Sequence, residues 1–575
     1  MSDPGAPPGT QPVSRTASVL LSLAAVAVAF AAADTYVVVL ALPNMMTSVG
    51  IPIDQLQRAA PIVSGFLLGY VAMLPLIGRI ADLRGRVPVL LMSLVVFSIG
   101  SLVTASSYDM TSMVGGRFMQ GVGGGGLVPA TLALVADLYP AHRRGVPLGI
   151  VSAVQEIGSV LGPLFGAAVL AVASWRAIFL VNLAVGAVLA VAIRSRTSVD
   201  QAPRISWRLP DPVGLLLAAL ALAAGAVAVI RPASMMRDLT VGEIFVPYAD
   251  HGRWWTPIGT ATLVLVLALL ARCWFARRPL VDLRGWFASL READLLGAVL
   301  LALTLAGVIL AFATADPQVE VFSAQGEWFL AGSLIAGLLF VVHARGAEAP
   351  LIPRRALHAV PAWGALLVSF FVGAALIAAL IDIPLFARTT TYLDSQLQAA
   401  LVLVRFLIAL PVGAVIGGFL TRRLPAGVIT AAGMVLAAVG FLLMAQWGEH
   451  SLTTAGANVP LFVGGLGFGL ALAPVNAALL ASTADDVHGV ASALVVVARM
   501  VGMLVGISAL TTIGLRRFYD APASLTAVQR AITQEHAVFQ GAAVCALIAG
   551  VLALVLFARA DTRELDTGAL LRTGG

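Results

Sequence analysis

Five ionisable residues lie within long apolar stretches of this 575-residue chain: Asp34, Arg117, Glu156, Arg405 and Arg499. A charged side chain at bilayer depth is costly unless it is paired, hydrated or protonated, so each of the five is a functional candidate. A carboxylate that alternates between charged and neutral forms can couple proton binding to a conformational change. The alternative for each residue is a structural ion pair, or a side chain that reaches towards the membrane interface.

Counting along the helices places these charges at particular depths. At ~1.5 Å per residue, Asp34 lies ~24 Å from the cytoplasmic end of its segment and Arg117 lies ~8 Å from the outer end of its own. The two residues are thus at similar depth, and we predict that they pair and that protonation of Asp34 releases Arg117. Glu156, Arg405 and Arg499 all fall near the midplane. We expect Glu156 to pair with one of these arginines, and the sequence leaves open which one.

Two further charges near helix ends receive simpler interpretations. Asp382 lies near the outer end of its segment, where we expect it to be hydrated. Arg272 lies near an inner helix end, where its long side chain is expected to reach the interface.

The elements that carry these residues are apolar segments of about 20 residues, the length needed to cross a ~30 Å hydrocarbon core. Hydrophobic residues make up 59% of the chain and charged residues only 11%, so a water-soluble protein is excluded. The pattern predicts an all-α polytopic membrane protein with sixteen spans. They are residues 18–41, 58–77, 87–107, 112–137, 147–172, 176–194, 212–230, 257–275, 294–314, 327–344, 361–386, 397–420, 427–446, 459–482, 489–515 and 538–558.

The arginines predict the orientation of these spans. All 35 basic residues are arginines, and they concentrate in every second connection. The positive-inside rule therefore places both termini in the cytoplasm. The net charge of +6 is explained by this topology, so we expect no nucleic-acid partner. Cys273 and Cys545 lie in apolar segments without metal-ligand spacing, and we expect no metal site.

Two glycine-containing motifs could control movement between helices. The loop after the second segment contains Gly78, Asp82, Arg84, Gly85 and Arg86. Its glycines allow close backbone approach, and Asp82 can bind a helix N-terminus or an arginine and so latch two bundles together. The fifth segment contains Gly158, Gly162, Pro163 and Gly166, which form a smooth stripe beside a bend.

These motifs resemble those of the major facilitator superfamily. The loop at 78–86 resembles the superfamily's signature loop, Arg117-x-x-Gln120-Gly121 resembles its fourth-helix motif, and the glycine stripe resembles the antiporter motif of exporters. The resemblance implies two six-helix bundles, which would comprise residues 18–194 and 361–558. Residues 195–360 would form a linker region with two helix pairs, while 1–17 and 559–575 would be disordered cytoplasmic tails.

Within the superfamily, segments such as Trp175-Arg176-Ala-Ile-Phe179-Leu-Val-Asn182 resemble the drug:proton antiporters. The branch most similar is that of the actinobacterial exporters of triacylglycerides and drugs that work with a periplasmic lipoprotein. This resemblance implies a monomeric exporter of lipids or lipophilic drugs in the cytoplasmic membrane, driven by the proton gradient without a cofactor. Mainly apolar cavity walls would suit such cargo. The alternatives are an uptake symporter, which the antiporter motif disfavours, and a membrane-embedded enzyme such as an acyltransferase, for which no convergent catalytic group is visible.

The two linker pairs share a sequence pattern. Asp211-Pro-Val-Gly214 opens the first pair and Asp294-Leu-Leu-Gly297 opens the second, and each pair ends in an arginine-rich exit that contains Pro-Leu. Leu- and Ala-rich helices resemble one another in general, but the shared order of Asp, Gly and exit favours a tandem duplication. An even number of inserted helices leaves the orientation of the following bundle unchanged.

Overall fold

The computed structural model consists of helices and connecting loops. It describes residues 15–51, 56–140, 143–196, 211–238, 241–248, 253–277, 279–313, 325–393, 395–522, 524–558, 560 and 562, and no strand occurs in these ranges. Within them, fourteen helices are long and apolar enough to cross a membrane, and a bent pair of helices adds a fifteenth candidate. Helix α5, 28 residues long, completes the set of long helices. The all-α transmembrane fold predicted from the apolar segments is confirmed.

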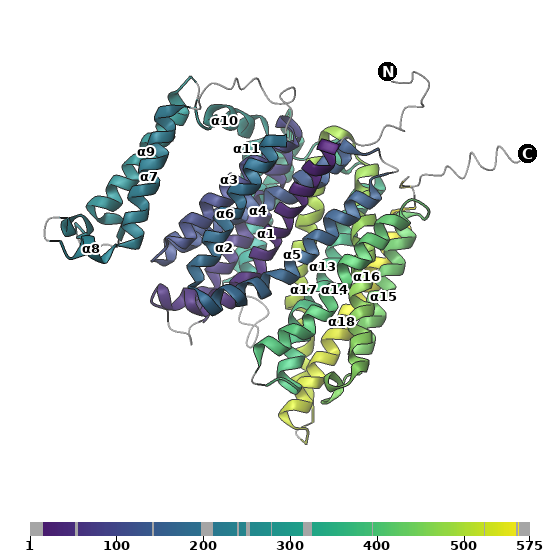
Figure 1. Cartoon of the computed structure of the whole chain (residues 1–575). Coiled ribbons are helices and arrows are strands. Elements are labelled where there is room, and N and C mark those ends of the chain that lie inside the picture. The colour runs from purple at the N-terminus through teal and green to yellow at the C-terminus, as the bar shows by residue number, and fades with distance from the viewer. Residues whose placement is uncertain are drawn as a thin grey trace, which may run out of the picture.

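The first six helices form one bundle, drawn in purple and blue in Figure 1. They are α1 (Arg15–Ser48), α2 (Leu56–Arg84), α3 (Arg86–Ala105), α4 (Met110–Leu138), α5 (Gly145–Val172) and α6 (Trp175–Arg196). Helix α4 packs on α1, α2 and α3. Its glycines permit this close approach, because a Cβ atom at Gly121 would collide with the carbonyl oxygen of Phe66 on α2. The G-x-G-x-x-G pattern of residues 121–126 is therefore a packing surface.

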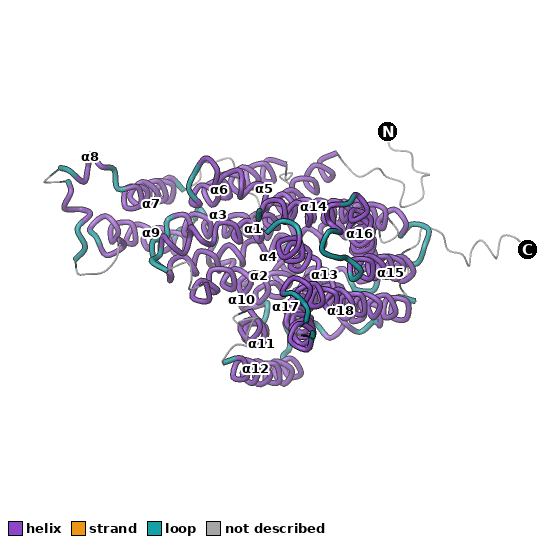
Figure 2. The backbone as a smooth tube through the Cα atoms, turned by 90° about the horizontal axis from the view of Figure 1, so that it is seen from below, coloured by secondary structure: helices purple, strands orange, loops and turns teal. Residues whose placement is uncertain are grey.

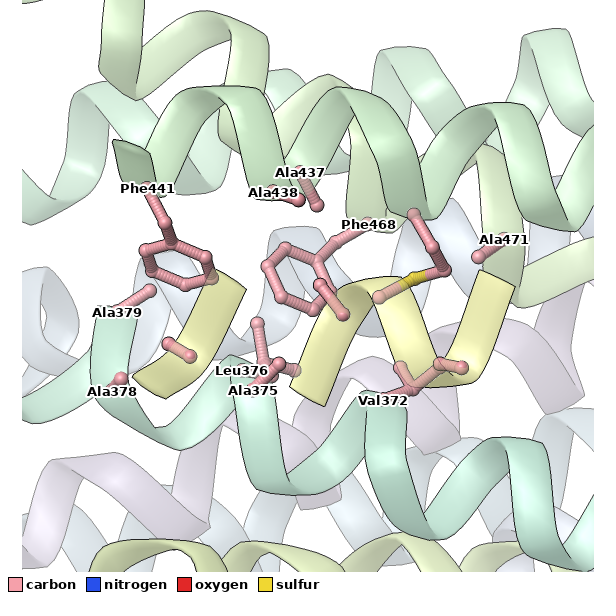
Figure 3. Packing of buried hydrophobic residues seen from close by; sticks show 14 of the residues in the cluster. Val372, Ala375, Leu376, Ala378, Ala379, Ala437, Ala438, Phe441, Phe468 and Ala471 are labelled. Carbon is pink, nitrogen blue, oxygen red and sulfur yellow. The ribbon is translucent and has the colours of Figure 1, made fainter. Parts of the chain in front are cut away.

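The last six helices form the second bundle, drawn in green and yellow in Figure 1. They are α13 (Val360–Thr390), α14 (Gln396–Leu420), α15 (Ala426–Met444), α16 (Asn458–Ala481), α17 (His488–Asp520) and α18 (Ala527–Leu556). Figure 3 shows the core of this bundle, where Phe441 and Phe468 lie among alanines such as Ala375 and Ala437. The two rings are 5.8 Å apart between centroids. Small residues on one helix thus make room for aromatic rings from the next.

The two bundles meet mainly through two helix pairs, α2 with α17 and α5 with α14, and α4 also contacts α17 while α5 contacts α16. In both pairs the closest contacts lie at the same end of the molecule. A Cβ atom at Gly78 of α2 would lie 2.6 Å from the carbonyl oxygen of Gly489 on α17, and one at Gly149 of α5 would lie 2.6 Å from that of Ala414 on α14. The bundles are therefore in backbone contact at the end that the arginine pattern assigns to the cytoplasm.

Between the bundles the chain forms two hairpins and a short connecting helix. The first hairpin is α7 (Pro212–Ile230) with α9 (Pro257–Phe275), and in Figure 1 it stands to one side of the first bundle. The second is α11 (Leu295–Ala313) with α12 (Gly326–Gly346), preceded by α10 (Leu283–Glu292). The chain bends by 77° between α10 and α11. Helix α11 packs on α2 and also on α17, and Figure 2 shows α12 on its outer side. The second hairpin therefore contacts both bundles where α2 and α17 meet.

Candidate functional site

The structure brings Asp34 and Arg117 together in the first bundle. Arg117 of α4 donates from Nη1 to Oδ2 of Asp34 on α1 over 2.7 Å, and both side chains are at most 1% exposed. The sequence placed the two residues at similar depth, and the packing of α1 on α4 supplies the contact. Because both partners are withdrawn from water, removal of one would leave the other as an uncompensated buried charge.

Amide and hydroxyl groups complete this network. Asn182 of α6 donates to Oδ1 of Asp34, and Gln120 also approaches this oxygen, at 3.5 Å from Nε2. Gln120 accepts a hydrogen bond from Arg117 over 3.0 Å and donates to Oγ of Ser101 on α3 over 2.9 Å. Helices α1, α3, α4 and α6 thus all contribute to the surroundings of one carboxylate.

Asn182 and Gln120 did not enter the set of site residues predicted from the sequence, although signals for both existed. Gln120 lies three residues after Arg117 and hence on the same helix face. Asn182 is a polar residue within an otherwise apolar segment, where polar groups mark hydrogen-bond partners.

Aromatic rings enclose the Arg117 side of the pair. The guanidinium carbon of Arg117 lies 4.4 Å from the ring centroid of Phe66 and 5.8 Å from that of Phe179. Such rings attract a cation but accept no proton from it, so they keep water away without replacing the carboxylate. Neutralisation of Asp34 would therefore leave Arg117 with much weaker partners.

Helix α5, which carries the glycine stripe that resembles the antiporter motif, packs against the part of α1 that contains Asp34. A Cβ atom at Gly158 would collide with the carbonyl oxygen of Ala29, and one at Gly162 with that of Ala33, the residue before Asp34. Gly166 is also buried. The side chains of Glu156 and Pro163 lie outside the described residues. The glycine stripe therefore sets the distance between α5 and the part of α1 that carries the buried carboxylate.

A second polar cluster lies at the end where the bundles touch. Asp82 of α2 accepts hydrogen bonds from the backbone N–H groups of Gly489 and Val490, over 2.8 and 3.0 Å, in the first turn of α17. It also accepts one from Arg86. Asp82 thus binds both a helix N-terminus and an arginine, the two kinds of partner considered from the sequence. We refer to Asp82, Arg86, Gly489 and Val490 as the latch.

Arg86 extends the latch across the interface. Its Nη2 donates to the backbone carbonyl of Asp485, which precedes α17, over 3.1 Å, and its Nε lies 3.3 Å from the carboxylate of Asp137 on α4. Arg144, just before α5, donates to the carbonyl of Leu480 in the second bundle over 3.2 Å. Burial lowers the pKa of Arg144, and the nearby carboxylates of Asp485 and Asp137 oppose this shift. Two arginines of the first bundle thus bind backbone carbonyls of the second.

The segment 78–86, predicted as a loop, is the end of α2 and the start of α3 with Gly85 between them, and its remaining residues make separate contacts. Gly78 lies where α2 and α17 touch, and Gly85 joins α2 to α3 with a φ of 91°, a conformation that favours glycine. Arg84 lies 3.6 Å from the carboxylate of Asp282 and 4.6 Å from the ring centroid of Trp286 on α10. Arg84 therefore links the end of α2 to the linker region and takes no part in the latch.

The two predicted midplane arginines lie in different surroundings. Arg405 is exposed, and its Nη1 donates to Oδ1 of Asn458 at the start of α16 over 3.1 Å. Arg499 is half-buried and lines a small cavity within the second bundle. Other residues that line this cavity are Ser369, Val372, Leu472 and Asn476. Because the side chain of Glu156 is not described, its pairing with either arginine stays a prediction.

The structure corrects the expectation for Asp382 and adds a partner to Arg272. Asp382 is not hydrated: it is 8% exposed, because α18 covers it. The side chain of Arg272 is 41% exposed, and its Nε and Nη2 donate to the carboxylate of Asp211, just before α7, over 2.9 and 3.0 Å, a partner that was not predicted from the sequence. The contacts come from α18 for Asp382 and from the residue before α7 for Arg272, and neither contact can be predicted from position along the chain.

The two linker hairpins share a bonding pattern around their opening aspartates. Asp211 precedes α7 and binds Arg272 on the return helix α9, whereas Asp294 precedes α11 and lies 2.7 Å from Nε2 of His343 on the return helix α12. The Arg272 hydrogen bond is the main cause of the lowered pKa of Asp211. Burial acts to raise the pKa of Asp294, but hydrogen bonds from Gly297, His343 and Leu351 outweigh it and lower the pKa. This shared pattern favours the proposed duplication.

Comparisons with known proteins agree with this architecture. The family model described as Major Facilitator Superfamily matches residues 24–507. Triacylglyceride transporters from Mycobacteroides abscessus and Mycobacterium tuberculosis are 35% and 34% identical to the chain, over 89% and 88% of its length and 85% of theirs.

Among solved structures, the human organic anion transporter MFSD10 has a TM-score of 0.55 at 13% identity, with 94% of this chain and 100% of that one covered. The proton:xylose symporter XylE has a TM-score of 0.53 at 12% identity, with 94% and 95% covered. At these identities the structures support the fold alone.

Proposed function

The chain belongs to the major facilitator superfamily, and we propose that it exports lipophilic molecules across the cytoplasmic membrane in exchange for protons. It is a multi-pass membrane transporter, so the alternative of a membrane-embedded enzyme falls away. We propose triacylglyceride-like lipids or hydrophobic drugs as cargo. The names of the relatives support the lipid.

The observation that carries the proton coupling is the dry ion pair between Asp34 and Arg117. Protonation of Asp34 would remove the charge that holds Arg117 and would weaken the contacts of α1 with α4 and α6. Because Gly158 and Gly162 hold α5 against the same part of α1, movement of α1 would be transmitted to α5, which contacts the second bundle through α14. A proton bound on one side of the membrane would in this way bias the rocking of the two bundles.

The latch gives this cycle a defined starting state. With Asp82 bound to the first turn of α17, the bundles are joined at the end that we assign to the cytoplasm. We propose that this is the state in which Asp34 accepts a proton from the outer side. Release of the latch would then open the cytoplasmic side to cargo from the cytoplasm or the inner leaflet.

The test uses purified protein in liposomes with an imposed pH gradient, a fluorescent drug and a labelled triglyceride. Asp34→Asn keeps the shape of the side chain but cannot alternate between charged and neutral forms, so proton-driven export should stop while insertion and folding persist. Asp520→Asn is the matched control, because Asp520 is exposed at the end of α17. Normal proton-driven export by Asp34→Asn would refute the assignment, and proton-driven accumulation towards the cytoplasmic side would favour uptake symport.

We further propose that the protein functions as a monomer with both termini in the cytoplasm and with a periplasmic lipoprotein as its partner. The lipoprotein proposal rests on the similarity to actinobacterial exporters. Its test is co-purification of the tagged transporter with a lipoprotein from its native membrane, with transport measured before and after that lipoprotein is added. Equal transport in both conditions would contradict the partnership.

A further inference from the structure

A second buried acidic group lies in the second bundle, remote from Asp34 in the first. Asp382 of α13 and Glu535 of α18 are 8% and 1% exposed, and their carboxyl groups are within hydrogen-bonding contact of each other. Two carboxylates in contact in an apolar interior cannot both be ionised, because the repulsion of like charges adds to the cost of desolvation. A contact of this kind is stable only when a proton lies between the two groups.

The surroundings of the pair are apolar and aromatic. Phe386 and Phe539 each lie one helical turn after the acidic residue of their own helix, and both rings pack on Trp447, with centroids 5.3 and 6.1 Å from it. Among the described atoms, Oε2 of Glu535 is buried and has no hydrogen-bond partner. A proton bound to the pair would remove the charge that this buried, unpartnered oxygen would otherwise share.

No cation neutralises the pair within the part of the chain that the structure describes: neither carboxyl group interacts with an arginine or a histidine. His536, the residue after Glu535, contacts the carbonyl of Trp447, and Arg530 lies over Phe518 of α17. Arg405 of α14 binds Asn458 and Arg499 of α17 lines the cavity. The remaining charged residues on the packed helices α13 and α17 are exposed, namely Arg388, Arg516, Arg517 and Asp520.

We infer that Asp382 and Glu535 form a proton-binding site, in which one proton bridges the two carboxyl groups and joins α13 to α18. The ligand is a proton and not a metal ion, because a hard cation needs about six oxygen ligands and the neighbours here are aromatic rings. The described residues contain no group of three or more His, Cys, Asp or Glu side chains that could hold a metal.

The site lies at the end of the bundle opposite to the latch. Asp382 is in the last third of α13 and Glu535 is in the first third of α18, whereas the latch is at the first turn of α17. The pair is therefore placed on the side from which an exporter would draw its protons. Any role in coupling rests on the proposed function, but occupancy of the site by a proton does not.

Infrared spectroscopy of the full-length protein in lipid nanodiscs tests the site directly. The wild-type protein should show a protonated carboxyl band at neutral pH that shifts in heavy water. The band should disappear in Asp382→Asn/Glu535→Gln, whose two amides can still hydrogen-bond to each other, and should persist in Asp520→Asn. The band should also persist in Asp34→Asn, because Asp34 lies in the first bundle. Failure of the proposed function, tested by transport in Asp34→Asn, can therefore be distinguished from failure of this inference, tested by the band.

Stability against pH supplies a second measurement. A proton held only by the folded state changes the folding equilibrium by roughly tenfold per pH unit, and stability falls as the pH rises. In the double variant the stability should fall less steeply as the pH rises, because the bound proton is gone. Asp520→Asn should show the same pH dependence as the wild type. If the double variant does not fold, the single variants replace it, because each changes the partner of the remaining carboxyl group and should shift its band. A wild-type spectrum without the band, or a band that no substitution at the two positions alters, would overturn the inference.

Discussion

The latch offers a quantitative test of how the two bundles are held together. The side chain of Asp82 is 1% exposed and accepts two backbone hydrogen bonds and one from Arg86. In Asp82→Asn one side-chain oxygen remains, so one N–H at the start of α17 loses its acceptor and Arg86 loses its charged partner on α2. A hydrogen bond to a charged group contributes about 1.5–3 kcal/mol. The attraction between a carboxylate and a helix N-terminus contributes about 0.3–1 kcal/mol.

Together these terms predict a loss of about 2–4 kcal/mol, since Arg86 keeps its contact with Asp137. At about 1.4 kcal/mol per factor of ten, the equilibrium between latched and unlatched states should shift by roughly 30- to 700-fold. From an unlatched population of about 1%, such a shift would give roughly 20–90%.

Distances between spin labels can report the two states. Arg194 of the first bundle and Arg423 of the second are exposed and can be replaced by labelled cysteines after removal of Cys273 and Cys545. Asp82→Asn should increase the population with the longer distance. Asp109→Asn is the control, because Asp109 caps the first turn of α4 within one bundle, with 2.9 Å to the N–H of Ser112. An unchanged distance distribution in Asp82→Asn would show that other contacts hold the bundles together.

Three further predictions address the topology, the midplane charges and the linker. Reporter fusions near Ala324 should be periplasmic and fusions near Pro353 cytoplasmic, whereas a cytoplasmic signal at Ala324 would reduce the number of spans to fourteen. Glu156→Gln should impair transport or expression, and so should Arg405→Gln or Arg499→Gln, whichever arginine pairs with Glu156. The matching double variant should be impaired less than the sum of the two single effects. Strictly additive effects with both arginines would mean that the charges act independently. The pKa of Asp294 is lowered in the folded state, so its contribution to stability is complete above the ordinary carboxyl range and is lost as the pH falls. Asp294→Asn should therefore accelerate hydrogen exchange in the α11–α12 hairpin at neutral pH, and the difference from wild type should disappear in acid.

Several features of this protein could be predicted from the sequence because they depend only on position along the chain. A span is recognised by its apolar length, and the depth of a charge by the helical rise, so the long helices and the common depth of Asp34 and Arg117 could be predicted. The partners of Asp82 could also be predicted, because a carboxylate near the end of a helix, beside a neighbouring bundle, has few types of partner. The resemblance to the superfamily could be recognised from local motifs such as the glycine stripe of α5.

The tertiary structure decided which side of each helix faces which neighbour. Asp382 was expected to be hydrated because it lies near a helix end, but α18 covers it and adds a second carboxyl group from 153 positions further along the sequence. Arg405 was placed near the midplane by counting, yet its side chain is exposed and binds Asn458. Depth along a helix follows from a fixed rise per residue, whereas the rotation of a helix about its axis, and hence the partner of each buried charge, is set by side-chain packing against helices distant in the sequence.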